Sequence, residues 1–279
     1  MAVDYEKEYD NRARVPEHPQ IFARWEAEAK AYRDASKGAQ IGLKYGPSAR
    51  QTIDFFPAGG ANAPLAMFIH GGWWRALSPV SFSQMAKGLN ANGIDVAVVG
   101  YDLCPTVSIA TITEQMRAAC LTLWNLHKKR ISVYGHSAGG HLTACMIATD
   151  WKSLDPSAPA DLVPAGYAIS GVFDLAPLTQ VSFNADLKLD DAEARRVSPL
   201  FWKVPEGAIL DAAVGGIESN EFLRQSKTIA EEWGQRGAKT RYVPIDGANH
   251  FTVLDPLTEA SSAMTKRIAE LAQHTASLA

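Results

Sequence analysis

Residues 131–147 read Ile-Ser-Val-Tyr-Gly-His-Ser-Ala-Gly-Gly-His-Leu-Thr-Ala-Cys-Met-Ile, and this stretch decides the fold. The apolar run Ile131–Tyr134 predicts a buried strand, and the residues from His141 onward have helical spacing. Between them lies a tight Gly-x-Ser-x-Gly turn with Ser137 at its tip. A serine there adopts a strained backbone that exposes its hydroxyl above the sheet, and the glycines avoid collisions within the turn. We therefore predict that Ser137 is a nucleophile.

A simpler interpretation of the same turn must be weighed. Serine is a common N-cap residue, so Ser137 could merely cap the helix that follows a glycine-rich turn. The five-residue pattern is also short enough to recur by chance. The rest of the chain must therefore supply the partners that a nucleophile needs.

Short apolar runs alternate with helical patterns through the central part of the chain. The predicted strands are Pro64–Ile69, Ile94–Val99, Ile131–Tyr134, Ala165–Ile169, Ala208–Val214 and Thr240–Ile245. The predicted helices are Ser81–Asn90, Thr111–Lys129, the helix after Ser137, Glu221–Arg236 and a last one from about Leu257. This order predicts an α/β fold with a mostly parallel central sheet and helices on both faces. Ligands bind at the carboxyl ends of such strands.

Composition narrows the function. The 279 residues are 47% hydrophobic and 20% charged, and the net charge of −3 provides no basic surface for nucleic acid or anionic lipid. The first ten residues lack the apolar core of a signal peptide, and no stretch is long enough to span a membrane, so we expect a cytoplasmic protein. Three scattered cysteines form no zinc or redox pair. We expect no metal and no cofactor.

A nucleophilic serine needs a base and an acid behind that base, in the chain order Ser, acid, His for this topology. His250 lies on a glycine-containing loop directly after the Thr240 strand, from which its imidazole can reach the serine. Glu218 lies at the end of the Ala208 strand, beyond Gly215 and Gly216. We predict that Ser137, Glu218 and His250 are the catalytic residues.

Other acids and histidines are weaker candidates. Glu221 suits the first turn of a helix, and Asp246 is too near His250 in sequence to reach behind its ring comfortably. Five other histidines are poorly placed as a base. His18 and His274 lie near the termini, and His127 lies on a helix beside lysines. His136 faces the other side of the turn from Ser137, and His141 lies on the first turn of the following helix.

The negative charge that develops on the substrate oxygen needs hydrogen-bond donors. His70-Gly71-Gly72-Trp73-Trp74 directly follows the first predicted parallel strand, and paired glycines there expose consecutive backbone N–H groups. We predict an oxyanion hole from Gly71, Gly72 and Trp73 together with the N–H of Ala138. The alternative is a plain two-glycine turn.

Two segments are expected to form a cap over the strand ends, namely residues 1–45 and the insertion 175–205, within a single domain of residues 1–279. The insertion contains Ala176-Pro177 and Ser198-Pro199 breaks, several aromatic residues and no clear strand. Its aromatic side chains either line an apolar cavity or form the cap's own small core. The predicted substrate pocket consists of Trp74, Phe173, Phe183 and Trp202.

A family resemblance rests on six motifs. They are His70-Gly-Gly-Trp-Trp74, Tyr101-Asp-Leu-Cys-Pro105, Gly135-His-Ser-Ala-Gly-Gly140, Ser170-Gly-Val-Phe-Asp-Leu175, Glu218-Ser-Asn-Glu-Phe222 with Arg224-Gln-Ser226, and His250-Phe251. Over nearly its whole length the chain resembles α/β-hydrolases of the kynurenine formamidase (arylformamidase) type, close to the hormone-sensitive-lipase and carboxylesterase group. One position departs from the animal enzymes, which have aspartate where this chain has Glu218.

These observations predict a serine hydrolase that acts on a small-molecule acyl substrate through an acyl-enzyme. The resemblance implies N-formylated arylamines such as N-formylkynurenine as the favoured substrates. A carboxylesterase for short-chain or aryl esters is the alternative within the same class, and a non-catalytic small-molecule binding protein on the same fold is the alternative of another class. No nucleic-acid or membrane partner is expected, and a homodimer is left open by the sequence.

Overall fold

The computed structural model describes residues 3–278 of the chain. Its strands are β1 (Gln40–Lys44), β2 (Thr52–Phe56), β3 (Leu65–Ile69), β4 (Asp95–Val99), β5 (Ile131–His136), β6 (Ala165–Ile169), β7 (Ile209–Gly215) and β8 (Lys239–Ile245). Its α-helices are α1 (Tyr5–Tyr9), α2 (Asn11–Arg14), α3 (His18–Ala35), α4 (Lys87–Asn90), α5 (Ile109–His127), α6 (Ala138–Ile147), α7 (Trp151–Leu154), α8 (Asn184–Leu187), α9 (Asp191–Arg196), α10 (Asn220–Gln235) and α11 (Ala263–Ser277). Short 3-10 helices occupy Pro79–Ser81, Ser83–Ala86, Ala176–Gln180, Pro199–Phe201 and Thr252–Thr258.

The strands form one eight-stranded sheet in the order β1-β2-β4-β3-β5-β6-β7-β8. Every pair from β4 to β8 is parallel, whereas β1 and β2 are antiparallel to their neighbours. The predicted mostly parallel sheet is therefore confirmed, and each of the six predicted strands is present within two residues of its predicted ends. Strands β1 and β2 were not predicted.

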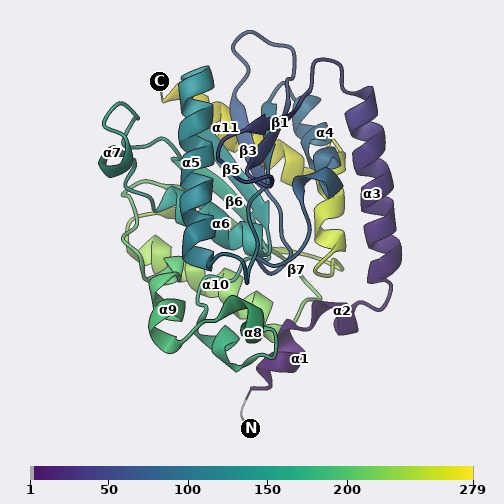
Figure 1. The fold of residues 1–279 in the computed structure, drawn as a ribbon, viewed down its shortest axis with the longest axis vertical. Helices are drawn as coiled ribbons and strands as arrows, with labels where there is room; N and C mark the ends of the chain where they lie inside the picture. Colours follow the sequence, from purple (N-terminus) through teal and green to yellow (C-terminus); the bar gives the residue numbers. More distant parts are fainter. Residues whose placement is uncertain (1–2, 279) are drawn as a thin grey trace.

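Helices cover both faces of this sheet (Figure 1). Along β3, Met67 and Ile69 belong to the apolar core that includes residues of α5, α6 and α10, whereas Ala66 and Phe68 belong to the core shared with α3 and α11. This alternation follows from the two-residue period of a strand, and burial on both faces explains why the parallel strands are continuous apolar runs. The two apolar cores hold the strand ends in fixed positions.

Two predicted helices differ from the structure. The helix expected over Ser81–Asn90 is broken into short 3-10 turns followed by α4. The last helix begins at Ala263 rather than near Leu257, because Pro256 lies within residues 252–258, which form a 3-10 helix instead. Both differences concern connections and leave the sheet unchanged.

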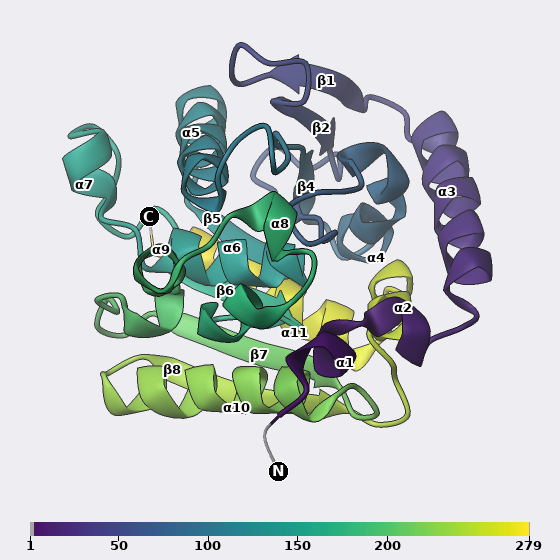
Figure 2. The same ribbon diagram turned by 60° about the horizontal axis from the view of Figure 1, so that its bottom comes forward.

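Segments from three parts of the chain gather at one end of the molecule. Figure 2 shows α1, α2, α8 and α9 together at this end. Helix α1 contacts α10 and the 3-10 helix Ala176–Gln180. Between β6 and β7 the chain forms only short helical turns, whereas residues 40–44, also within the N-terminal 45 residues, form the edge strand β1. Within residues 3–278, no helix combines the length and apolarity needed to cross a membrane.

Candidate active site

Ser137 lies in the turn between β5 and α6 in a strained conformation. Its φ is 56° and its ψ is −115°, and it is 3% exposed. This positive φ is uncommon for a residue with a side chain and is typical of functional sites. Ser137 stands at the N-cap position of α6, yet its side chain makes no capping hydrogen bond. The structure therefore does not support the interpretation of Ser137 as a helix cap.

The glycines of this turn are required by backbone contacts. A Cβ atom on Gly139 would lie 1.9 Å from the carbonyl oxygen of Ile69, and one on Gly135 would lie 2.3 Å from the carbonyl oxygen of Gly139. The backbone is held further by the Ser137 N–H, which donates to the Ile169 carbonyl at 2.8 Å. The turn is thus wedged between the ends of β3 and β6.

His250 and Glu218 form a buried pair. The two atoms His250 Nδ1 and Glu218 Oε2 are 2.6 Å apart, and the side chains are 5% and 1% exposed. The other carboxylate oxygen, Oε1, accepts hydrogen bonds from the Ser170 hydroxyl at 2.5 Å and from the Gly215 N–H at 2.7 Å. Both oxygens are therefore partnered, as a buried carboxylate requires.

The loops that carry this pair approach each other closely. A Cβ on Gly215 would lie 2.4 Å from the carbonyl oxygen of Ala248, so only glycine fits there. Asn249 accepts the N–H groups of Phe251 and Thr252 through its side-chain oxygen, both at 2.9 Å. These contacts hold His250 in place from both sides.

The alternative acids have other surroundings. The carboxylate of Glu221 accepts hydrogen bonds from the Tyr9 hydroxyl and from Arg224, and it makes no bond to a histidine within residues 3–278. Asp246 is exposed on the loop before His250. Of the three acids considered, Glu218 alone contacts His250.

His136 also contacts His250, and the sequence did not predict this contact. Its Nε2 donates to the His250 carbonyl at 2.8 Å, and the two rings are 4.7 Å apart. Burial, followed by the proximity of His250, holds the pKa of His136 well below its ordinary value. His136 is therefore a neutral support of the His250 backbone. The Ser170 hydroxyl, at the start of the Ser170–Leu175 motif, also contacts Glu218, a contact that the sequence did not predict.

The loop after β3 has an unusual backbone. Gly72 has a φ of 113°, and Trp73 and Trp74 have φ values of 51° and 54°. Within residues 3–278, the N–H groups of Gly72 and Trp73 make no hydrogen bond. Ala138 is the first residue of α6, where helical N–H groups lack intrahelical partners. Gly71 packs closely against the serine turn, since a Cβ atom on it would lie 2.9 Å from the His136 carbonyl oxygen and 3.1 Å from Ser137 Cβ.

The His70 side chain holds this loop in its conformation. Its ring stacks on Tyr101 with centroids 4.3 Å apart, its Nδ1 donates to the Gly71 carbonyl at 2.7 Å, and the Tyr101 hydroxyl donates to the His70 carbonyl at 2.8 Å. Burial lowers the pKa of His70 to about 4, so the ring stays neutral at ordinary pH. The conformation of the loop is thus maintained by uncharged groups.

A family comparison agrees with this geometry. Residues 66–254 match a family model described as an α/β-hydrolase fold. The chain belongs to the α/β-hydrolase family. The matched α/β-hydrolase region runs from β3 to just beyond His250, so it contains the serine turn, the glycine loop and the buried Glu–His pair.

Relatives and solved structures of α/β-hydrolases resemble the chain over most of its length. Kynurenine formamidase of Danio rerio is 27% identical over 238 residues, which cover 82% of this chain and 80% of that protein. A solved structure described as a candidate thioesterase from Silicibacter sp. TM1040 is 32% identical, with a TM-score of 0.87 over 96% of this chain and 99% of that one. An esterase of Pyrobaculum calidifontis is 18% identical, with a TM-score of 0.72 over 92% of each chain, and shows the shared fold.

The serine and histidine of this α/β-hydrolase open into one cavity of about 250 Å³. Its wall includes Ser137, His250, Gly72, Trp73 and Phe183. The N-terminal segment, predicted as part of a cap, also lines the cavity, although none of its residues was predicted for the substrate pocket. These lining residues are Glu6, Tyr9, Asp10, Asn11, Arg12, Phe22 and Trp25. Seven lining residues are aromatic and four are charged, and a lining of aromatic side chains with a few polar groups is typical of a small-molecule site.

Three residues predicted for the substrate pocket lie elsewhere, and Phe183 alone of the four lines the cavity. Trp74 is fully buried, with its ring edge-on to His141 and the ring centroids 5.0 Å apart. Phe173 is fully buried as well. Trp202 donates its indole N–H to the Arg196 carbonyl at 2.8 Å and lies beneath the Arg117 guanidinium. Trp74 and Phe173 thus belong to the apolar core, whereas Trp202 is half-buried against Arg117 and Arg196.

Proposed function

We propose that this α/β-hydrolase cleaves small acyl substrates through an acyl-enzyme on Ser137. The observation that carries the proposal is the buried contact between His250 Nδ1 and Glu218 Oε2, at 2.6 Å, beside the same cavity that the strained Ser137 lines. A serine needs such a base and orienting acid to become a nucleophile at neutral pH.

The proposed reaction has two stages. Ser137 Oγ attacks the acyl carbon while His250 Nε2 takes its proton, and the same histidine then protonates the leaving group. Water, deprotonated by His250, next attacks the acyl-enzyme, and His250 returns the proton to Ser137 Oγ as the bond to the acyl carbon breaks and the acid leaves. Glu218 fixes the tautomer with the proton on Nδ1 and stabilises the imidazolium that forms in each stage.

The N–H groups of Gly72, Trp73 and Ala138 are proposed to hold the negative charge on the substrate oxygen. The support is that the first two make no hydrogen bond within residues 3–278, and that Gly72 and Trp73 line the cavity beside Ser137. Donors fixed in advance in this way reduce the reorganisation needed in the transition state, and each is worth about 3 kcal/mol.

N-formyl arylamines are the favoured substrates. The support is the relatedness to proteins named kynurenine formamidase in Danio rerio, Salmo salar and Drosophila melanogaster, together with a small aromatic-lined cavity. Short-chain or aryl esters are the second candidate, favoured by the esterases among the similar solved structures. We also propose that residues 1–45 and 175–205 contribute a cap, which the cavity-lining residues Tyr9 and Phe183 support.

Parallel measurements of kcat/KM on N-formylkynurenine and p-nitrophenyl acetate test the substrate. We expect turnover of the formamide that Ser137→Ala abolishes while the variant remains folded. If the ester is cleaved and the formamide is inert, the ester is the substrate class. If purified wild-type protein cleaves neither, the proposed hydrolase activity is wrong.

A further inference from the structure

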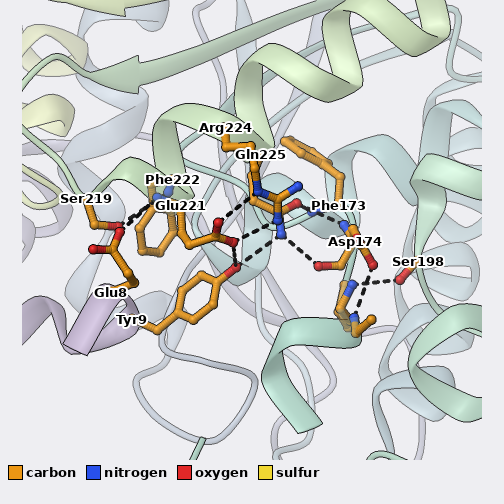
Figure 3. Close-up of polar contacts among 12 residues, drawn as sticks. Glu8, Tyr9, Phe173, Asp174, Ser198, Ser219, Glu221, Phe222, Arg224 and Gln225 are labelled. Atoms are coloured by element: carbon orange, nitrogen blue, oxygen red, sulfur yellow. Dashed lines mark hydrogen bonds and ion pairs between the residues drawn. The ribbon is translucent and has the colours of Figure 1, made fainter. Parts of the chain in front are cut away.

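The motif Glu221-Phe-x-Arg-Gln225 has no part in the chemistry described above. Figure 3 shows its side chains joined to the N-terminal helix α1 on one side and to the chain after β6 on the other. Gln225 Oε1 accepts the N–H groups of Phe173 and Asp174, at 2.8 and 2.9 Å, and its Nε2 donates to the Asp174 carbonyl at 2.7 Å. Gln225 Nε2 also makes a second hydrogen bond.

That contact is with Tyr9, on α1. Gln225 Nε2 donates to the Tyr9 hydroxyl at 3.1 Å, and the hydroxyl donates to Glu221 Oε2 at 3.0 Å (Figure 3). Burial, followed by the charge of Glu221, raises the pKa of Tyr9, so the phenol remains a donor. Burial raises the pKa of Glu221, but hydrogen bonds from Arg224 and Tyr9 and the charge of Arg224 outweigh it and hold the pKa below its ordinary value. The phenol therefore donates to a charged acceptor.

Helix α1 has two more attachments. The carboxylate of Glu6 accepts both the N–H and the hydroxyl of Ser182, each at 2.6 Å. The carboxylate of Glu8 accepts the N–H of Glu221 at 3.0 Å. Hydrogen bonds to charged groups are the stronger kind, so this five-residue helix is fastened at both sides although it is too short to be stable alone.

The same helix forms part of the cavity wall. Tyr9 and Glu6 line the cavity, and the Tyr9 ring is edge-on to Trp73 at 5.7 Å and to Phe222 at 5.6 Å. Phe222 in turn lies 4.5 Å from the His250 ring. The Tyr9 hydroxyl is thus engaged by α10, while its ring packs against residues next to the reacting groups.

We propose that α1 is a specificity-determining wall of the substrate pocket, attached by Tyr9 to the Glu221–Gln225 motif and by Glu6 to Ser182. The inference rests on the proposed function. The attachments of α1 set how large a substrate the pocket accepts, and the attaching side chains take no part in making or breaking bonds. Releasing α1 enlarges the pocket, weakens the binding of small substrates and admits larger ones.

The test uses Tyr9→Phe and Glu6→Ala, singly and together. Tyr9→Phe keeps the ring and removes only the hydroxyl, and Glu221 keeps its two bonds to Arg224. The matched control is Tyr5→Phe on the same helix, since the Tyr5 hydroxyl makes no hydrogen bond within residues 3–278 and Tyr5 does not line the cavity. Substrates are p-nitrophenyl esters from acetyl to octanoyl, with phenyl and naphthyl acetate as a second series.

We expect the double variant to raise KM for the acetyl ester about tenfold with kcat within about threefold of wild type. The ratio of kcat/KM for the large substrate to that for the small one should rise about tenfold in at least one series. Hydrogen–deuterium exchange of residues 3–14 should quicken in the double variant and stay unchanged in Tyr5→Phe.

Three outcomes would overturn the inference. In the first, both selectivity ratios are unchanged in a double variant whose α1 exchanges faster. In the second, kcat falls with KM unchanged, which would make α1 a support of the reacting groups. In the third, α1 exchange is the same as in wild type. Wild-type turnover of the acetyl ester or of N-formylkynurenine separates this failure from failure of the proposed function itself.

Discussion

Glu218 and Asp246 are both acids on loops near His250, and only their surroundings separate them. Glu218 is buried and makes three hydrogen-bonding contacts, one of them to His250 Nδ1. Asp246 is exposed. A buried carboxylate with fixed partners can orient an imidazole and stabilise its charged form, whereas an exposed one is screened by water.

This difference predicts the effect of removing each charge. Glu218→Gln should lower kcat by about 10³- to 10⁴-fold, because the amide favours the wrong tautomer of His250 and cannot stabilise the imidazolium. Asp246→Asn should leave kcat within about twofold of wild type. Steady-state kinetics on whichever substrate the wild type cleaves measure both. The reverse order of effects would assign the acid to Asp246.

The sequence alone predicted Ser137, Glu218 and His250 as catalytic residues because each follows a recognisable strand end. It did not identify the contacts of Ser170 and His136, which depend on how β6 and β5 are aligned beside β7. It also placed Trp74 and Phe173 in the pocket, because an aromatic residue near a strand end has the same appearance in sequence whether it faces the substrate or the core.

The turn between β5 and α6 leaves no space for a side chain at Gly139. A Cβ on Gly139 would meet the Ile69 carbonyl oxygen at 1.9 Å, and this neighbour is backbone within a buried strand. Gly60, by contrast, has its nearest neighbour at 3.7 Å from a Cβ atom and lies on an exposed loop.

We expect Gly139→Ala to lower the free energy of unfolding by about 3 kcal/mol or more, because β3 and the turn must move apart. Gly60→Ala should change it by less than about 0.5 kcal/mol. Urea denaturation followed by tryptophan fluorescence measures both variants. Equal stability of Gly139→Ala and wild type would contradict the wedged geometry of the turn.

Strands β3 to β7 were predicted from the sequence because burial on both faces makes each of them an apolar run. Strand β1 was not, because its residues are mostly exposed at the sheet edge and lack such a run. The helical segment α1–α2 was also missed. Its two short helices are held by contacts with distant residues such as Glu221 and Ser182, which no local pattern reveals.

Buried neutral histidines make the free energy of unfolding depend on pH. Burial lowers the pKa of both His70 and His141 from 6.5 to about 4, and it lowers that of His136 as well. Below pH 6.5 the unfolded chain protonates these rings while the folded chain does not, so the unfolded state binds more protons. Stability is therefore full above pH 6.5 and is lost as the pH falls toward 4.

The expected slope is about 1.4 kcal/mol per pH unit for His70 and for His141 between pH 6.5 and 4. Urea denaturation at several pH values measures it, and His141→Gln should reduce the slope by about that amount. An unchanged slope in His141→Gln would show that His141 is protonated in the folded protein.

An activated nucleophile at Ser137 is what separates an enzyme from a binding protein of the same fold. Labelling with a fluorophosphonate, followed by mass spectrometry of the intact protein and its peptides, tests this most directly. We predict one adduct per chain on Ser137, formed much more slowly in Glu218→Gln and absent in Ser137→Ala. Folded wild-type protein that stays unlabelled, or that carries the adduct on another residue, would contradict the account.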